Sequence, residues 1–185
     1  MVSGTVIIDL GPLRKYRTAL EADFRLRANG PVRKSFKQWA ARYRSFLRER
    51  FDKYSKGGGD WAPLKDSTIK RRRKGKGTRR FAAGSVAILR DKGIMFAALD
   101  PVFKNKPGQL QDDIPFGIRV GFGGAAPHGD DKITVAYLAL IHNQGLGHIP
   151  ARIIVVAPDS ATQRGMASDM ERAHNQMVKD TNAGA

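Results

Sequence analysis

The stretch 31-PVRKSFKQWAARYRSFLRERFDKY-54 carries the clearest periodic pattern in the chain and decides the central element of the fold. Its apolar and aromatic residues recur at alternating steps of four and three, which is the spacing of one face of an α-helix. We therefore predict a long amphipathic helix from about Pro31 to Tyr54, with an aromatic face toward the core and a basic face toward solvent. The predicted inner face consists of Val32, Phe36, Trp39, Tyr43 and Phe46. The predicted outer face consists of Arg33, Lys34, Lys37, Arg44 and Arg48.

Short β-branched or alternating runs outside this helix predict strands. Residues 116–122 alternate as a half-buried strand does, and the run IIVV at 153–156 is typical of a buried strand. The run at 5–8 is predicted to be a strand, and the run at 86–89 either a strand or the start of a helix. The polar stretch 100–113, which contains two prolines, is predicted to be a loop.

Helical patterns or capping signals occur on both sides of the central stretch. A last helix is predicted to begin at Asp159 or Ser160, whose side chains are both suited to an N-cap. The other predicted helices are Leu13 to Arg27, a short one from Gly93 to Leu99, and Val135 to His142 with its end near Gly145.

Together these elements predict an α+β fold, with a small and mainly antiparallel sheet flanked by two or three helices. A chain of 185 residues suits one globular domain, so the sequence predicts a single domain over 1–185. That domain is expected to include a long flexible basic loop at about 66–84 and a frayed tail at about 180–185.

The positive charge of the chain is concentrated at one end of the sequence. Residues 1–80 hold 23 Lys and Arg against 7 Asp and Glu, a balance of +16, whereas residues 81–185 hold 10 of each kind. Such an asymmetry predicts one strongly electropositive surface, which attracts phosphate groups or an acidic protein. A solubilising surface without a dedicated partner is the alternative interpretation.

The densest part of this charge is the tract at 70–80, in which eight of eleven residues are Lys or Arg. The tract has almost no apolar side chains to bury, so we expect it to be mobile unless it is bound. It offers enough cations for several phosphate contacts, with affinity that falls as salt rises. The predicted contact residues are Lys70, Arg71, Arg72, Arg73, Lys74, Lys76, Arg79 and Arg80.

Residues suited to catalysis or metal binding are few. The chain has no Cys, which excludes disulfides and thiolate metal sites. Its four His residues and its paired Asp residues match no strong ligand or catalytic spacing, and no phosphate loop or nucleophile elbow is present. We therefore expect no enzymatic activity, no metal and no cofactor. No apolar run approaches the length of a membrane span, and the N-terminus lacks the features of a secretory signal.

Four separated stretches nevertheless occur in an order that resembles the phage virion-morphogenesis family, which includes tail-completion and neck proteins of tailed bacteriophages. The first is the Trp61–Leu64 stretch, WAPL, followed by Ser, Thr and basic residues. The second is ILRDKGIM at 88–95, the third ALIHNQG at 139–145, and the fourth IPAR at 149–152.

The resemblance implies architectural roles for the residues of these stretches. Trp61 and Leu64 would fix the basic loop to the body of the protein. Gly93 would permit a tight helix start. His142 and Gly145 would close a short helix, with the imidazole hydrogen-bonded inside the turn.

Two residues of the fourth stretch receive roles in the same way. Pro150 would fix the approach to the strand that follows it. Arg152 would pair with an acidic group or with a chain end.

The function implied by the resemblance is that of a structural virion protein at the head–tail junction. Such proteins form oligomeric rings, typically hexamers, that join the connector to the tail around the DNA channel. The implied partners are other copies of the chain, the connector or adaptor, and the tail terminator or tail tube. The packaged DNA end is a further candidate contact for the basic residues. The protein would be assembled in the bacterial host cytoplasm and reside in the neck or tail of the virion.

Two alternatives remain open at this level. The first is a sequence-nonspecific nucleic-acid-binding accessory protein, for which the basic tract would supply phosphate contacts. The second is a small metal-dependent enzyme that uses the His residues.

Overall fold

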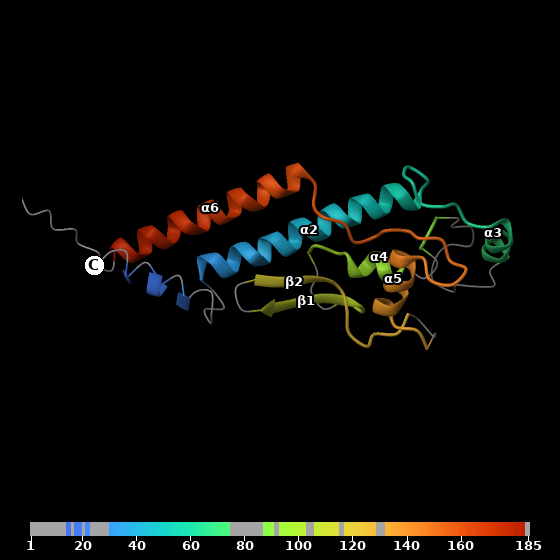
Figure 1. Ribbon diagram of the computed structural model, residues 1–185, viewed down its shortest axis with the longest axis horizontal. Helices are drawn as coiled ribbons and strands as arrows, with labels where there is room; N and C mark the ends of the chain where they lie inside the picture. The colour runs from blue at the N-terminus through green and yellow to red at the C-terminus, as the bar shows by residue number, and fades with distance from the viewer. Residues whose placement is uncertain are drawn as a thin grey trace, which may run out of the picture.

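The computed structural model describes residues 14–15, 17–19, 21–22, 30–74, 87–90, 93–102, 106–114, 117–128 and 132–183. The fold is α+β, with several helices around one small antiparallel sheet (Figure 1). The described residues between 14 and 22 are helical. The elements that follow are α2 (Pro31–Ser55), α3 (Asp66–Arg73), α4 (Ile94–Ala98), β1 (Gln109–Ile114), β2 (Gly117–Phe122), α5 (Val135–Gln144) and α6 (Ser160–Ala183).

Helix α2 is the long central helix of the fold, and its bounds agree with the helix that the periodicity predicts. Helix α6 runs along one side of it, whereas β1, β2, α4 and α5 lie on the other side (Figure 1). Near the start of α2, Val32 and Phe36 pack against Ala173 and Met177 of α6. A larger core forms around the second half of α2, where Leu47 and Phe51 are fully buried. Each such side chain contributes roughly 1.5–3 kcal/mol when it leaves water, so packing on both sides determines where this helix lies.

The contact between α2 and α6 also contains a buried carboxylate. Asp169 of α6 is 2% exposed and accepts hydrogen bonds from Arg42 Nε at 2.6 Å and from Arg42 Nη2 at 3.2 Å. Arg172 binds the same carboxylate from one turn further along α6. Trp39 Nε1 donates to the carbonyl oxygen of Met166 at 2.7 Å. These directional bonds fix the register of the two helices, because a buried carboxylate without its partners would be costly.

The predicted basic outer face of α2 is wrong for its buried members. Arg33 and Arg44 are 8% and 2% exposed, because the sheet covers the side of α2 that was assigned to solvent. Arg33 Nη1 donates to the carbonyl oxygens of Ile114 and Gly117, and Arg44 Nη1 donates to the side chain of Gln111. Burial lowers the pKa of the Arg44 guanidinium from its ordinary value. Buried arginines are tolerated here because the sheet supplies oxygen acceptors.

Three other members of the predicted outer face are more accessible. Lys34 is exposed and Lys37 is half-buried. Arg48 is half-buried and forms an ion pair with Asp100, with 3.1 Å between Nη1 and Oδ2. The cations of α2 therefore act mainly within the molecule and form no continuous outward face.

The sheet differs from the predicted one in two places. Residues 109–114 form β1, although 109–113 belong to the predicted loop, and they pair antiparallel with β2 from Gln109 opposite Phe122 to Ile114 opposite Gly117. The polar composition of β1 concealed it, because this strand binds α2 partly through polar contacts. The run at 153–156 forms no strand. The predicted strand at 5–8 lies outside the described residues.

Several helix boundaries agree with the sequence, and two need correction. Gly145 ends α5 in the left-handed conformation, and Asp159 caps α6 by accepting a hydrogen bond from Thr162 N at 2.8 Å. Residues 87–90 form a turn in place of the predicted strand or helix start. The tail predicted to fray at about 180 is helical to Ala183. Within the described residues, none of the helices combines the length and apolar character needed to cross a membrane.

Candidate partner-binding site

Three of the four stretches of the family resemblance meet in the larger core, and the fourth leads directly into it. Trp61 of the first stretch, Ile88 and Met95 of the second, and Ala139 of the third all belong to one buried cluster. Ile154, two residues beyond the fourth stretch, completes it at 1% exposure. Segments that are far apart in the sequence thus build one rigid end of the molecule, and α3 projects from this end (Figure 1).

Trp61 anchors the start of α3, as the sequence predicted. Its ring packs edge-on against Phe51 and Tyr54, with centroids 5.2 and 5.6 Å away. Its Nε1 donates to the carbonyl oxygen of Ile153 at 3.2 Å. Leu64 is half-buried against the same core. The turn before α3 is therefore held by both apolar packing and a hydrogen bond.

Arg152 binds this turn from the opposite direction. Its Nε and Nη2 donate to the carbonyl oxygen of Ala62 at 3.1 and 3.0 Å, and Nη2 also approaches Pro63 O at 3.4 Å. The predicted acidic partner or chain end is therefore wrong, because backbone carbonyls take that place. Arg152 is 5% exposed, and burial lowers the pKa of its guanidinium from its ordinary value. The positive charge of Arg72 acts on that pKa in the same direction.

The segment 153–156 joins no sheet among the described residues, because side chains take the place of a neighbouring strand. Asn143 Oδ1 accepts hydrogen bonds from Ile154 N at 3.0 Å and from Val155 N at 3.2 Å. The hydroxyl group of Tyr43 donates to Val156 O at 2.7 Å. Sequence reasoning missed Asn143. The available signal was an amide side chain two residues before a helix-ending glycine, a residue type that readily binds nearby backbone.

The end of α5 lies directly against the start of this segment. Gly145 has a φ of 70°, and a Cβ atom there would lie 2.8 Å from Ala151 N. Arg152 N donates to His142 O at 2.6 Å. Pro150 is exposed in the short connection between the two. Gly145 therefore allows both the left-handed helix end and the close approach of the next segment.

His142 is partly buried in the last turn of α5. Its Nδ1 is buried and has no hydrogen-bond partner among the described residues, so this nitrogen does not make the hydrogen bond that was predicted for the imidazole. Burial lowers the pKa of His142 to about 4, and the positive charge of Arg152 adds to this effect, as does His128. The imidazole is consequently neutral near pH 7. Within the described part of the chain, no group of three His, Asp or Glu side chains is placed to hold a metal ion.

The first half of the predicted basic loop is the helix α3. Asp66 lies in its first turn and four cations lie in its last turn, an arrangement that the helix dipole favours. Gly93 of the second stretch has a φ of 68° at the start of α4, as expected for a tight turn. Lys76, Arg79 and Arg80 lie outside the described residues.

The cations of α3 differ in what they contact. Arg72 is half-buried and donates from Nη1 to Ala87 O at 2.7 Å. Lys70, Arg71, Arg73 and Lys74 are exposed and form no ion pair within the described ranges. Neighbouring cations three or four residues apart on a helix repel each other by a few tenths of a kcal/mol per pair. This cluster is therefore suited to an anionic partner that would relieve the repulsion.

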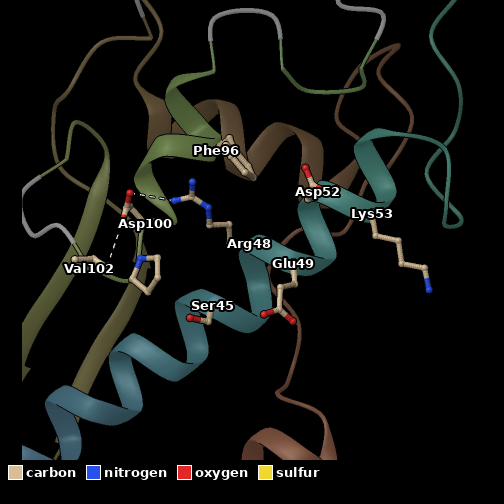
Figure 2. Close-up of a pocket in the computed structure, with 9 residues that line it drawn as sticks. Ser45, Arg48, Glu49, Asp52, Lys53, Phe96, Asp100 and Val102 are labelled. Carbon is tan, nitrogen blue, oxygen red and sulfur yellow. Dashed lines mark hydrogen bonds and ion pairs between the residues drawn. The ribbon is translucent and has the colours of Figure 1, made fainter.

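An open hollow of about 630 Å³ lies between the second half of α2 and residues 96–102 (Figure 2). Two of its carboxylates are neutralised by cations of the chain, since Asp52 pairs with Arg90 and Asp100 pairs with Arg48. Both guanidinium groups also lie over the ring of Phe96, 4.0 and 4.5 Å from its centre. The carboxylates of the hollow are thus balanced by cations of the same chain, and the hollow offers little to attract a separate cation.

Comparison of the chain with protein-family models, with curated proteins and with solved structures found no match in any of the three.

Proposed function

We propose that this chain is a structural protein of a tailed-phage virion that acts at the head–tail junction. In this proposal its copies assemble into a ring, a hexamer, that joins the connector to the tail around the DNA channel. The observation that supports it most is that three of the four family-like stretches place Trp61, Met95 and Ala139 in one buried cluster, which Ile154, just beyond the fourth stretch, completes.

The contacts between these stretches support an architectural role for them. Arg152 of the fourth stretch binds Ala62 of the first, and Trp61 of the first stretch binds Ile153, the residue directly after the fourth. The side chains of Arg152 and Trp61 both donate hydrogen bonds to backbone carbonyl groups. Such contacts hold an element in position and do not prepare a group for proton transfer or nucleophilic attack.

The surface that results suits an assembly component that meets an anionic neighbour. Lys70, Arg71, Arg73 and Lys74 extend from the rigid end of the molecule on α3. In the proposed ring, copies of this helix face either the packaged DNA end or an acidic surface of the connector, adaptor, terminator or tube. Assembly would take place in the bacterial host cytoplasm and the protein would remain in the neck or tail of the virion.

The test is removal of the protein from a phage that encodes it. We expect filled heads and free tails that do not join, and we expect joining to resume when purified protein is added to the separated parts. Electron microscopy of the particles measures both outcomes. Normal joining in the absence of the protein would contradict the proposal.

The exposed cations of α3 favour a second candidate, a nucleic-acid-binding accessory protein without sequence preference. This candidate predicts binding to short DNA duplexes of unrelated sequence with similar affinity, and a steep loss of affinity with rising salt. Fluorescence anisotropy at several salt concentrations measures both properties. Negligible duplex binding near 0.15 M salt, roughly the physiological ionic strength, would remove this candidate.

A further inference from the structure

An apolar stripe covers the outer side of α5. Six of the seven exposed large apolar side chains among the described residues lie between Ile133 and Val155. Ile133, Tyr137 and Leu140 follow one another at steps of four and three, and they are 40%, 53% and 44% exposed. Tyr137 and Leu140 therefore share one face of α5, opposite the buried Val135 and Ala139, and Ile133 lies just before the helix begins. We refer to Ile133, Tyr137 and Leu140 as the α5 stripe.

The segment that carries the stripe has no charged residue of its own, in a strongly cationic chain. No Lys, Arg, Asp or Glu occurs between residues 133 and 151, although the chain as a whole carries a net charge of +16. Close contact between two copies is opposed by their like charge. The electrostatic repulsion between two copies is weakest at an uncharged face, and burial of an apolar face gains the most free energy.

A complementary groove occurs on the opposite side of the molecule. It has a volume of about 560 Å³ and lies along α2 and α6, where Trp39, Met166, Ala167 and Met170 give it an almost entirely apolar surface. Its one carboxylate is Glu171. Met side chains are flexible and contact aromatic rings favourably, so a groove of this composition adapts well to an inserted Tyr or Leu.

The α5 stripe and this groove cannot meet within one copy. Helix α6 lies on one side of α2, whereas α5 contacts β2 and α4 on the other side (Figure 1). An apolar stripe and an apolar groove on opposite sides of one chain have the placement that a head-to-tail contact requires. Such a contact repeats from copy to copy and closes into a ring when the rotation between copies allows it.

We propose that the α5 stripe of one copy inserts into the α2–α6 groove of the next copy. The occupant of the groove is therefore a second copy of this chain. The inference deepens the proposed self-assembly and rests on it, because it names the two surfaces that the subunits use.

Cross-linking tests the contact directly, because the chain has no Cys of its own. The double variant Leu140→Cys with Ala167→Cys, treated with a short bis-maleimide, is expected to give a ladder of covalent multimers. Each single variant is expected to give none. The matched control combines Ala167→Cys with Val102→Cys, since Val102 is apolar and 77% exposed but belongs to neither surface. Dimers from Leu140→Cys alone would show a face-to-face contact and overturn the proposal, as would a ladder from the control pair.

Complementation of blocked variants provides the second readout. Leu140→Arg blocks the stripe and Ala167→Arg blocks the groove, and both positions are exposed, so the fold is expected to remain intact. Each variant alone should be monomeric by sedimentation velocity. An equimolar mixture should form heterodimers and nothing larger, because it contains one intact stripe and one intact groove per pair. Circular dichroism checks that both variants are folded.

The outcomes separate this inference from the function on which it rests. Rings that form equally well from both blocked variants would overturn the stripe-and-groove contact and leave the proposed function standing. A wild-type chain that stays monomeric, together with normal head–tail joining in its absence, would remove both.

Discussion

Arg152 reaches across the core to bind Ala62, with its Nε and Nη2 at 3.1 and 3.0 Å from the same carbonyl oxygen. The bond joins the segment after α5 to the turn before α3. It holds the base of the cationic helix in place without using any of that helix's exposed charges.

Replacement of Arg152 by Met is expected to destabilise the protein by about 1–3 kcal/mol. The aliphatic volume remains, but the carbonyl oxygen of Ala62 loses the partner that compensates for its burial. Denaturant unfolding followed by tryptophan fluorescence measures the change. Arg71→Met is the matched control, because Arg71 is exposed on α3 and its replacement should stay within about 0.5 kcal/mol. Equal stability of the two variants would show that the Arg152 bond contributes nothing.

Removal of the four exposed α3 cations should leave the fold intact and weaken anion binding. Lys70, Arg71, Arg73 and Lys74 contact no acidic group within the described residues, so their replacement by Gln should change the unfolding free energy by about 0.5 kcal/mol or less. If α3 contacts DNA, the slope of log affinity against log salt should fall by about 3 to 4.

The control for this variant is Arg72→Met. Arg72 donates to Ala87 O, so its loss should cost about 1 kcal/mol of stability and have a smaller effect on anion binding. Duplex affinity that is unchanged in the fourfold variant would mean that α3 does not contact nucleic acid. Head–tail joining that is unchanged as well would exclude α3 as a partner site.

Asn143 provides a test of how the segment 153–156 is held. Replacement by Leu leaves the N–H groups of Ile154 and Val155 without their acceptor, and we expect a loss of about 2 kcal/mol or more. Asn143→Asp keeps an acceptor oxygen in the same place and should be clearly less damaging. Chemical denaturation of both variants gives the comparison. Equal losses would mean that volume, and not hydrogen bonding, decides this position.

Ala substitutions at two glycines distinguish the cost of backbone strain from the cost of a steric clash. Gly145 and Gly147 have φ values of 70° and 66°, so Ala carries the same conformational cost at both, about 1–2 kcal/mol. A Cβ atom at Gly145 also meets Ala151 N at 2.8 Å, whereas at Gly147 nothing lies within 4 Å. Gly145→Ala should therefore be the more destabilising of the two, as measured by thermal unfolding. The reverse order would show that the end of α5 is not packed as described.

Stability should fall as the pH drops from 6.5 toward 4. The pKa of His142 is about 4 in the folded protein and 6.5 in its ordinary state, so the unfolded chain takes up the proton first. The contribution is complete above pH 6.5 and is lost progressively below it. Because the residue is only half-buried, we expect a loss of about 1–2 kcal/mol. Urea unfolding of the wild type and of His142→Asn at several pH values measures it, and an identical pH dependence in both would contradict this assignment.

Much of the framework could be predicted from local pattern. The spacing of Val32, Phe36 and Trp39 predicts α2 almost to its ends, and Gly145 and Asp159 mark the boundaries of α5 and α6. These features depend on backbone conformation and on neighbours within one or two turns. That information is contained in a short window of sequence.

Predictions from sequence patterns alone were wrong where residues from other parts of the sequence supply the hydrogen-bond partners. The run at 153–156 has the composition of a buried strand, yet Asn143 and Tyr43 satisfy its backbone from distant positions. Helix α3 was assigned to a loop because its cations repel each other, but Trp61 and Arg72 fix its two ends.

The sequence by itself determined the long central helix, the α+β class and the concentration of positive charge in residues 1–80. Only the tertiary structure decided which of those charges face solvent. Arg33 and Arg44 turn inward because the sheet offers them oxygen acceptors, whereas the four exposed cations of α3, Lys70, Arg71, Arg73 and Lys74, meet no acidic partner in the described part of the chain. The physical reason is that periodicity fixes which side chains share a helix face, but the partners packed against that face determine whether a charge can be buried there.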